Sequence, residues 1–461
     1  MPQTIVIADD ITGAGDIGIM YAGAGMKTMV YDGKKEDNPA YEPCDVLILD
    51  TDSRLCSPEE AYSRVYRKVR QVSDMGAGQY INKQCSVFRG NIGAEFDAML
   101  DALQEEFAVV VLGFPDNGRT TLHGIHYVDG IPLERSQFRN DPVHPMRKSS
   151  LKDILQQQTG RRVDNIWYET YEGGEEAVRQ AVEEKRKKGG YCIMDVRDNR
   201  DLELLAGALR EEKILCGSSA LSGYLARLQA GDLAGDGGEA GREHGRGRVL
   251  GVAGSLMPQT AAQTEYLQRR GYPVFTLDTR LLFAPEKRRR ECGRILEAVG
   301  NAYESAAFVM IRTAQDPDIV KETKRQGAAL GMGNVEISAM VSEALSEVAL
   351  QVIRDREIRD LIVCGGDTSA AICERLEVRG MQVLEEIETG LPLCGSVGRP
   401  SRRLVLKSGS FGSRTFLEKA LTAIRQDAEG GRGGGDFEAS GQTDGKISST
   451  GGMQERHTGG L

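Results

Sequence analysis

Residues 5–18 read IVIADDITGAGDIG, and this stretch combines the two patterns that decide the fold. Its first part, TIVIA when Thr4 is included, is short, continuous and rich in β-branched residues, which is typical of a strand buried on both faces. Asp9 and Asp10 follow directly, and the Gly-rich string 12–16 is predicted as a turn that leads into a helix. A strand, a turn and a helix in this order indicate a parallel α/β sheet.

The same alternation continues along most of the chain. Strand-like runs are KTMVY, DVLILD, QYINK, AVVVLG and YCIMDV, and helix-like segments with charged faces span 58–72 and 175–188. The pattern starts again after residue 247, with VLGVAGS, PVFTLD, AAFVMIRTA, DLIVCGGD and RRLVLKSGS. We therefore predict two α/β domains with mostly parallel sheets. A chain of 461 residues is long enough for two cores.

Composition places the domain boundaries. Residues 231–247, GDLAGDGGEAGREHGRG, are too polar and Gly-rich to bury a core and are predicted to be a flexible linker. Residues 428–461 almost lack aliphatic side chains and are predicted to be a disordered tail. We expect one domain over 1–230, a second over 248–427, and an active site in the cleft between them.

Charge and cysteine usage exclude several functional classes. The formal net charge of -10 argues against nucleic acid or an anionic membrane as the main partner. The chain shows no signal-peptide pattern and no apolar run near the roughly 20 residues of a membrane span, so we expect a cytoplasmic protein. The nine cysteines form no C-x-x-C pair, which favours reduced thiols. His123 and His126 are a close pair, but surface or substrate contact is favoured over metal binding, and any metal ligands remain unknown.

Polar residues follow four predicted strands of the first domain. In open parallel sheets, ligands bind beyond the carboxyl ends of the strands. These positions carry Asp9 and Asp10, then 50–54 with Arg54, then Lys83, Ser86 and Arg89, then Asp116, Asn117 and Arg119. Carboxylates and cations at one rim suit a small anionic molecule rich in hydroxyl groups. The alternative for each residue alone is a helix cap or a surface ion pair.

The second domain offers glycine and serine at its strand ends. Three turns, around Gly254 and Ser255, 365–368 and 408–412, would let backbone N–H groups approach phosphates. Each turn alone also fits an ordinary tight connection between strand and helix. The chain has no G-x-x-x-x-G-K-[ST] segment, and its strand-to-helix turns lack G-x-G-x-x-G. Together the two domains suggest phosphoryl transfer across a cleft, assisted by Mg²⁺.

The string TGAGD, residues 12–16, resembles the anion-binding loop of ribokinase-like sugar kinases. In that family the loop lies near the end of the catalytic domain, whereas here it follows the first strand. A ribokinase-like enzyme would also have a single domain with a small β lid, which this chain does not offer. Position therefore argues that the likeness is a coincidence of a short Gly-rich string.

A second resemblance covers roughly residues 4–425. The motifs IVIADDITGAGD, DTDSR, RGNIG, GRTTLHG, DPVHP, CGGDT, TGLPL and KSGSFG occur in the order found in the four-carbon acid sugar kinases. The resemblance implies an ATP-dependent kinase with Mg²⁺. It also implies an acid-sugar domain over 1–230 and a nucleotide domain over 248–427. Members of the family phosphorylate the terminal hydroxyl of acids such as threonate, erythronate or 3-oxo-tetronate.

The resemblance also implies site residues. The expected substrate contacts are Asp9, Asp10, Asp16, Arg54, Lys83, Gln84, Cys85, Ser86, Arg89 and Arg119. The expected nucleotide contacts are Ser255, Gly365, Gly366, Asp367, Thr368 and Gly409. Asp10 is the expected catalytic residue, which orients or deprotonates the hydroxyl, and Asp16 would support the turn.

One departure from the family pattern concerns the substrate. Where the family commonly has Lys-x-Asp-Ser-Thr-x-Arg-Gly, residues 83–90 read KQCSVFRG, with Cys85 for Asp and Val87 for Thr. This change alters which substrate hydroxyls can be satisfied, so the acid sugar and its stereochemistry are not fixed. A nucleophilic role for Cys85 is disfavoured because no histidine is predicted beside it.

A competing hypothesis is a sugar-acid sensor that keeps the kinase fold without turnover. Retention of Asp9, Asp10 and all three Gly/Ser turns argues against it. The sequence leaves the oligomeric state open, a homodimer included.

Overall fold

The computed structural model describes residues 1–32, 41–141, 143–231, 247–398 and 400–430. The predicted linker, 231–247, and the predicted tail, 428–461, therefore lie almost wholly outside the described residues. All nine cysteines are free thiols. Within the described part of the chain, none of the helices is both long and apolar enough to cross a membrane.

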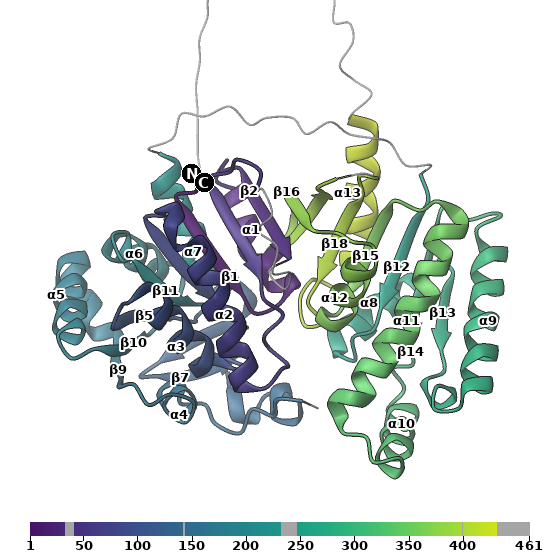
Figure 1. The fold of residues 1–461 in the computed structure, drawn as a ribbon, viewed down its shortest axis with the longest axis horizontal. Coiled ribbons are helices and arrows are strands. Elements are labelled where there is room, and N and C mark those ends of the chain that lie inside the picture. The colour runs from purple at the N-terminus through teal and green to yellow at the C-terminus, as the bar shows by residue number, and fades with distance from the viewer. Residues whose placement is uncertain (33–40, 142, 232–246, 399, 431–461) are drawn as a thin grey trace, which may run out of the picture.

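The N-terminal half is a parallel sheet covered by helices (Figure 1). Its strand order is β2 (Thr28–Asp32), β3 (Val46–Asp50), β1 (Thr4–Ala8), β4 (Gln79–Lys83), β11 (Ile214–Gly217), β5 (Phe107–Val111), β10 (Gly190–Met194) and β9 (Val163–Ile166). Its helices are α1 (Ile11–Ala22), α2 (Pro58–Val72), α3 (Ile92–Leu103), α4 (Leu151–Gln156), α5 (Gly174–Arg186), α6 (Asn199–Leu209) and α7 (Ala220–Ala230). A small antiparallel sheet contains β6 (Arg119–Leu122), β7 (Ile125–Val128) and β8 (Ile131–Pro132).

The C-terminal half repeats the plan with an antiparallel addition. The parallel strands are β13 (Val274–Leu277), β14 (Phe308–Thr313), β12 (Val249–Ala253), β15 (Asp360–Cys364) and β18 (Arg403–Lys407). The hairpin of β17 (Leu391–Ser396) and β16 (Gly380–Glu388) continues the sheet in antiparallel pairing. The helices are α8 (Pro258–Arg269), α9 (Pro285–Ala302), α10 (Pro317–Ala329), α11 (Asn334–Arg356), α12 (Gly366–Arg375) and α13 (Phe416–Gly430).

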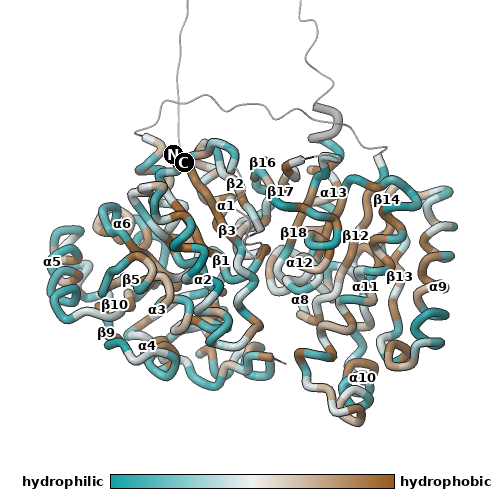
Figure 2. The backbone as a smooth tube through the Cα atoms, in the orientation of Figure 1, coloured by the Kyte–Doolittle hydropathy of each residue, from teal (hydrophilic) through white to brown (hydrophobic). Residues whose placement is uncertain are grey.

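The hydropathy of the chain explains these layers. The central strands are hydrophobic and the outer helix faces hydrophilic in Figure 2, and every residue of β1, β3 and β5 is buried. Parallel strands covered by helices on both faces need such continuous apolar runs. Helix α2 begins at Pro58 after the N-cap Ser57, whose side chain accepts a hydrogen bond from the Glu60 N–H. The prediction of a mostly parallel α/β fold is confirmed.

The two halves share one continuous sheet. Strand β2 pairs antiparallel with β16 through Met29–Tyr31 and 380–382, which joins the strands of both halves into one 15-stranded sheet. This joint lies at the centre of the molecule in Figure 1. We predicted two sheets, one in each domain, because no local pattern links segments some 350 residues apart.

We predicted a turn at the Gly-rich string 12–16, but the structure places these residues inside helix α1. The prediction was wrong because Asp10 caps the helix so early: its carboxylate accepts a 2.7 Å hydrogen bond from the Gly13 N–H. A Cβ added to Gly15 would lie 3.3 Å from the Pro392 side chain, and one added to Gly18 would lie 2.9 Å from the Val383 side chain. The glycines therefore allow the β16–β17 hairpin to pack closely on α1.

Candidate active site

Two acidic residues and one arginine form the centre of the site. Asp9 and Asp10 follow β1, and Arg54 follows the neighbouring parallel strand β3. The Arg54 guanidinium donates to both carboxylate oxygens of Asp9 at 2.7 Å, through Nε and Nη2, and donates to Asp10 through Nη1. Asp9 is fully buried, whereas Asp10 reaches the cavity described below. One guanidinium thus holds both carboxylates.

The two carboxyl groups differ in acidity. Burial raises the pKa of Asp9 above its ordinary value, although Arg54 opposes this effect. Burial also disfavours ionisation of Asp10, but the charges of Arg54 and Lys83 outweigh it and hold the pKa of Asp10 below its ordinary value. Hydrogen bonds from the Gly13 N–H and the Thr12 hydroxyl, the latter 2.9 Å, act in the same direction. Asp10 is therefore ionised near neutral pH.

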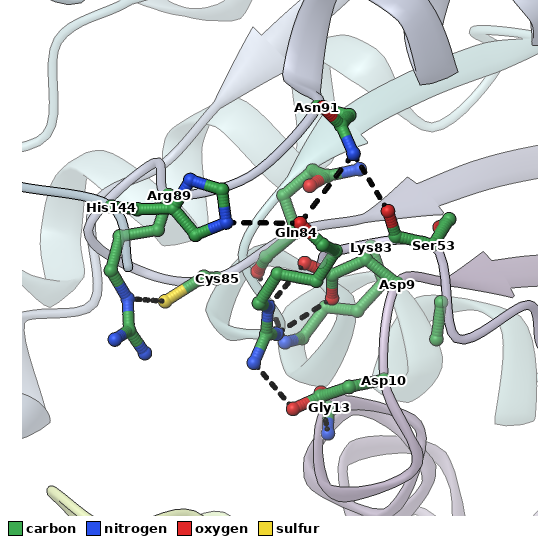
Figure 3. A network of polar contacts seen from close by, with 12 residues as sticks. Asp9, Asp10, Gly13, Ser53, Lys83, Gln84, Cys85, Arg89, Asn91 and His144 are labelled. Carbon is green, nitrogen blue, oxygen red and sulfur yellow. Dashed lines mark hydrogen bonds and ion pairs between the residues drawn. The ribbon is translucent and has the colours of Figure 1, made fainter. Parts of the chain in front are cut away.

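A second ion pair lies beside the first (Figure 3 labels Lys83). Lys83 Nζ, at the end of β4, lies 3.0 Å from Asp16 Oδ2, which also accepts a 2.8 Å hydrogen bond from the Ser219 hydroxyl. The other oxygen of Asp16 is buried and has no hydrogen-bond partner in the structure. A Cβ added to Gly390 would lie 2.5 Å from that oxygen. The hairpin of the C-terminal half therefore covers this acid directly.

The segment after β4 places a thiol between arginines. Arg89 Nε donates to Cys85 Sγ at 3.4 Å (Figure 3), and Arg89 Nη1 donates to Asp141 at 2.5 Å. Burial raises the pKa of the Cys85 thiol, but the positive charges of Arg89 and Arg54 outweigh that effect and lower it. The ring of His144 is 3.1 Å from the Arg54 carbonyl oxygen. The DPVHP motif thus supports the arginines from outside.

A small cavity brings the two halves of the chain together. Its volume is about 20 Å³, which is room for about one water molecule. The N-terminal half contributes Asp10, Thr12, Gly13, Asp16, Arg54, Lys83, Cys85, Ser86, Val87 and Phe138, and the C-terminal half contributes Ser408, Ser410 and Phe411. The cavity is polar and charged on one wall and is closed by the 408–411 turn on the other.

Other expected substrate residues lie behind this wall. Asp9 accepts hydrogen bonds from Arg54, and Arg89 donates one to Cys85. Gln84 is fully buried and donates to Asn82 at 2.6 Å and to Glu95 at 2.7 Å. The guanidinium carbon of Arg119 lies 6.0 Å from the centre of the ring of Phe411, a residue of the C-terminal half. Among the described residues no carboxylate forms an ion pair with Arg119, and its buried Nε has no hydrogen-bond partner.

The expected nucleotide residues also lie together. They follow β12, β15 and β18, which are neighbours in the sheet. A Cβ added to Gly409 would lie 2.1 Å from Ser255 Oγ, and one added to Gly254 would lie 2.0 Å from Thr368 Oγ1. Gly365 has a φ of 119°, which side-chain-bearing residues rarely adopt. Only glycine therefore permits this close packing of the three turns.

The two sets of residues meet at Asp10. Helix α12 begins at Gly366, and a Cβ added there would lie 3.0 Å from Asp10 Oδ2. Asp367, in the first turn of α12, has a pKa raised by burial and by repulsion from Asp52 and Asp10, against the attraction of Arg54. The N-terminus of α12 therefore faces the acidic centre of the N-terminal half.

Sequence reasoning did not name several cavity residues. Thr12, Phe138 and Phe411 line the cavity but carry no charge that would have marked them, whereas Val87, which the family pattern did mark, lines it as well. Thr12 lies inside the motif IVIADDITGAGD, which could have marked it as a site residue. Phe138 lies three residues before the DPVHP motif, which could have marked it in the same way. His126 is fully buried and bonds the Ser86 carbonyl at 2.9 Å, and burial lowers its pKa to about 4. It is thus a neutral support for Ser86.

The described residues contain no group of three or more His, Cys, Asp or Glu side chains arranged to hold a metal ion. A magnesium ion bound by one or two carboxylates and by substrate phosphates does not need such a group.

The fold and the site define a class of two-part α/β protein. A model of a sugar-binding N-terminal domain matches residues 4–225, and a model of a nucleotide-binding C-terminal domain matches residues 250–417. The chain belongs to the four-carbon acid sugar kinase family, and it is an enzyme of the kinase class.

Curated relatives cover almost the whole chain. A 3-oxo-tetronate kinase from Pseudomonas fluorescens is 33% identical over 90% of this chain and 95% of its own length. A 3-oxo-tetronate kinase from Methylobacterium radiotolerans is 32% identical over 90% of this chain and 97% of its own length. A D-erythronate kinase from Heliobacterium modesticaldum is 29% identical over 93% of this chain and 95% of its own length.

Solved structures share the fold. A Salmonella typhimurium protein, provisionally described as a tRNA synthase, is 27% identical and superposes with a TM-score of 0.74, covering 91% of this chain and 99% of its own. A Haemophilus influenzae protein is 28% identical with a TM-score of 0.66 and the same coverage, 91% and 99%.

Proposed function

We propose that the protein is an ATP-dependent kinase of the cytoplasm that phosphorylates the terminal hydroxyl of a four-carbon acid sugar, such as threonate, erythronate or 3-oxo-tetronate. One observation carries this proposal: the Asp10 carboxylate lies against Gly366, where the helix α12 of the nucleotide-binding half begins. Phosphoryl transfer needs the acceptor hydroxyl and the γ-phosphate side by side, with little covalent help from the protein.

Asp10 is proposed as the catalytic residue. Because its pKa lies below the ordinary value, it is ionised and accepts a hydrogen bond from the attacking hydroxyl. Such a weak base orients the hydroxyl first and takes the proton late in the transfer. Arg54 and Lys83 hold the charges of Asp10 and Asp16 in place.

The substrate carboxylate needs a cation that is not already neutralised. Arg54, Lys83 and Arg89 each pair with an aspartate, whereas no carboxylate pairs with Arg119 within the described residues. We therefore assign the substrate carboxylate to Arg119, since a guanidinium can donate two parallel hydrogen bonds to a carboxylate. Cys85 and Ser86 line the cavity and would contact the hydroxyls between the two ends of the substrate.

The nucleotide side fits phosphates. The N-terminus of α12 follows β15, between the strands that lead into the turns at Ser255 and Gly409, and the N–H groups of a helix N-terminus favour phosphate. Asp367, in the first turn of α12, is the carboxylate we assign to Mg²⁺. A bound Mg²⁺ supplies charge neutralisation for the transferred phosphoryl group.

Domain movement is part of the proposal. A cavity of about 20 Å³ cannot hold an acid sugar together with the end of ATP, so the halves must separate for binding. Their closure would then exclude water from the phosphoryl group, which prevents its loss to hydrolysis.

The test is ADP formation with a panel of threonate, erythronate and 3-oxo-tetronate stereoisomers. We expect turnover with at least one acid and a phosphate ester on its terminal hydroxyl, identified by phosphorus NMR. The uncharged alditols erythritol and threitol are matched controls, and we expect little turnover because they lack the carboxylate. Tight binding of an acid without any turnover would favour the sensor hypothesis instead.

A further inference from the structure

Lys407 is a buried lysine beside the proposed nucleotide site. It ends β18, is fully buried, and directly precedes the 408–411 turn. Its ammonium lies 2.8 Å from the Ser408 carbonyl oxygen, 3.2 Å from that of Gly409 and 3.1 Å from that of Phe411. It also donates to the Thr260 hydroxyl at 3.0 Å. All of these acceptors are neutral, and they exceed the three protons that an ammonium can donate.

These contacts fix the direction of the peptide groups in the turn. In a trans peptide the carbonyl and the following N–H point in opposite directions. Since the carbonyls of Ser408 and Gly409 point at Lys407, the N–H groups of Gly409 and Ser410 point away from it. Neither N–H has a hydrogen-bond partner among the described residues. Ser408 and Ser410 line the cavity that also contains Asp10.

Helix α8 supports the same turn with neutral groups. Thr260 donates to the Gly409 carbonyl at 2.9 Å. Gln263 donates to the carbonyls of Phe411 at 3.1 Å and Gly412 at 2.9 Å. Neutral side chains can therefore donate the hydrogen bonds that hold the carbonyls of this turn. The positive charge of Lys407 is not needed for those hydrogen bonds.

That charge is not compensated inside the protein. The ionisable groups that face Lys407 are the buried thiol of Cys364 on β15 and the carboxylate of Glu388 on β16. Glu388 already pairs with Lys419 of α13 at 2.7 Å, and α8 contributes only Thr260 and Gln263. Burial lowers the pKa of Lys407 to about 8. A buried cation without an anion is costly, and an anion bound at the turn would offset this cost.

We propose that Lys407 is a positioning residue for phosphate: its ammonium gathers the carbonyls of the 408–411 turn, so that the N–H groups of Gly409 and Ser410 face a bound phosphate that supplies the missing negative charge. The inference rests on the proposed function, since it assigns the phosphates of the nucleotide to this turn. Lys407 need not touch the phosphate, because its charge acts through the turn.

The test measures the dissociation constant of ADP between pH 7 and pH 9 by calorimetry. One pH unit above a pKa of about 8 leaves roughly a tenth of the ammonium charged, so wild-type affinity should fall several-fold to about tenfold at pH 9. In Lys407→Met we expect about tenfold weaker binding at pH 7 and little further change with pH. Lys287→Met removes an exposed charge on α9, outside the turn, and should keep the wild-type profile.

Thermal unfolding separates this effect from loss of structure. The pKa of Lys407 is lower in the folded chain than its ordinary value of 10.5, so the unfolded chain binds more protons between pH 8 and pH 10. The contribution of Lys407 to stability therefore rises with pH over the range in which nucleotide affinity falls. A merely structural lysine would not weaken binding in this range.

The outcomes are distinct. Wild-type ADP affinity that stays constant from pH 7 to pH 9 would overturn the inference even if Lys407→Met fails to fold. Equal affinities of the wild type and a folded Lys407→Met would also overturn it. A wild type that binds no nucleotide at all would overturn the proposed function instead.

Discussion

At the scale of single residues, the site depends on how Arg54 divides its hydrogen bonds between two acids. Its contacts to Asp9 occupy both oxygens of that carboxylate, whereas Asp10 keeps an edge toward the cavity. Asp10 also caps α1 through the Gly13 N–H. The two interpretations open at the sequence level, a helix cap and a site residue, are therefore compatible in one side chain.

Asp10→Asn separates these roles. Asparagine caps helices about as well as aspartate, so α1 should keep its start and its stability. The amide cannot accept a proton, and we expect kcat to fall by about 10²- to 10⁴-fold while ADP affinity stays the same. Steady-state kinetics and calorimetry measure both. Turnover close to that of the wild type would refute the role of Asp10.

Cys85→Asp tests substrate selection. A carboxylate at this position would lie between Arg54 and Arg89 and would offer an acceptor to a substrate hydroxyl. An unmet buried donor costs about 1–3 kcal/mol, so the ratio of kcat/KM between two acid sugars should change by about tenfold or more. Cys292→Ser, on α9 and outside the cavity, is the control. An unchanged order of preference across the panel would contradict a role for residue 85 in selection.

At the scale of elements, the contact between α1 and the β16–β17 hairpin decides how the halves meet. Gly15 faces Pro392 and Gly18 faces Val383, so at these two positions the helix presents no side chain to the hairpin. The strand β1 and helix α2 were predicted from local pattern, and α2 has the predicted bounds 58–72. The start of α1 was not predicted from local pattern. The glycines at 13 and 15 usually indicate a turn, and this signal concealed Asp10 as the N-cap of the helix.

Gly18→Ala tests this contact. Alanine favours helix by about 1 kcal/mol over glycine, so a helix that acted alone would become more stable. In this structure the new methyl group would lie 2.9 Å from Val383 Cγ2, and we expect closure to be strained and kcat to fall several-fold. Gly18→Ala with Val383→Ala removes that atom and should restore much of the activity. A fully active single variant would show that the contact is loose.

At the scale of the whole molecule, the halves form one sheet and close over a cavity too small for the substrates. The candidate residues could be predicted because they follow strands at one rim, where local sequence is informative. The joint between β2 and β16, the covering of Asp16 by Gly390 and the burial of Lys407 could not. They depend on contacts between distant segments, and a buried lysine has the same sequence letter as an exposed one.

Closure predicts a pattern of hydrogen exchange. With ADP and an acid sugar bound, amides of α1, the β16–β17 hairpin, the first turn of α12 and the 408–412 turn should exchange more slowly. The outer helices α5 and α9 are internal controls and should not change. Protection confined to one half of the chain would contradict a site made by both.

The most direct test of the account is a crystal structure with a non-hydrolysable ATP analogue and the preferred acid sugar. We predict that the terminal hydroxyl of the sugar lies about 2.6–3.2 Å from Asp10 Oδ2 and faces the γ-phosphate at the N-terminus of α12. A terminal hydroxyl directed away from Asp10, or a γ-phosphate bound far from Gly366, would contradict it.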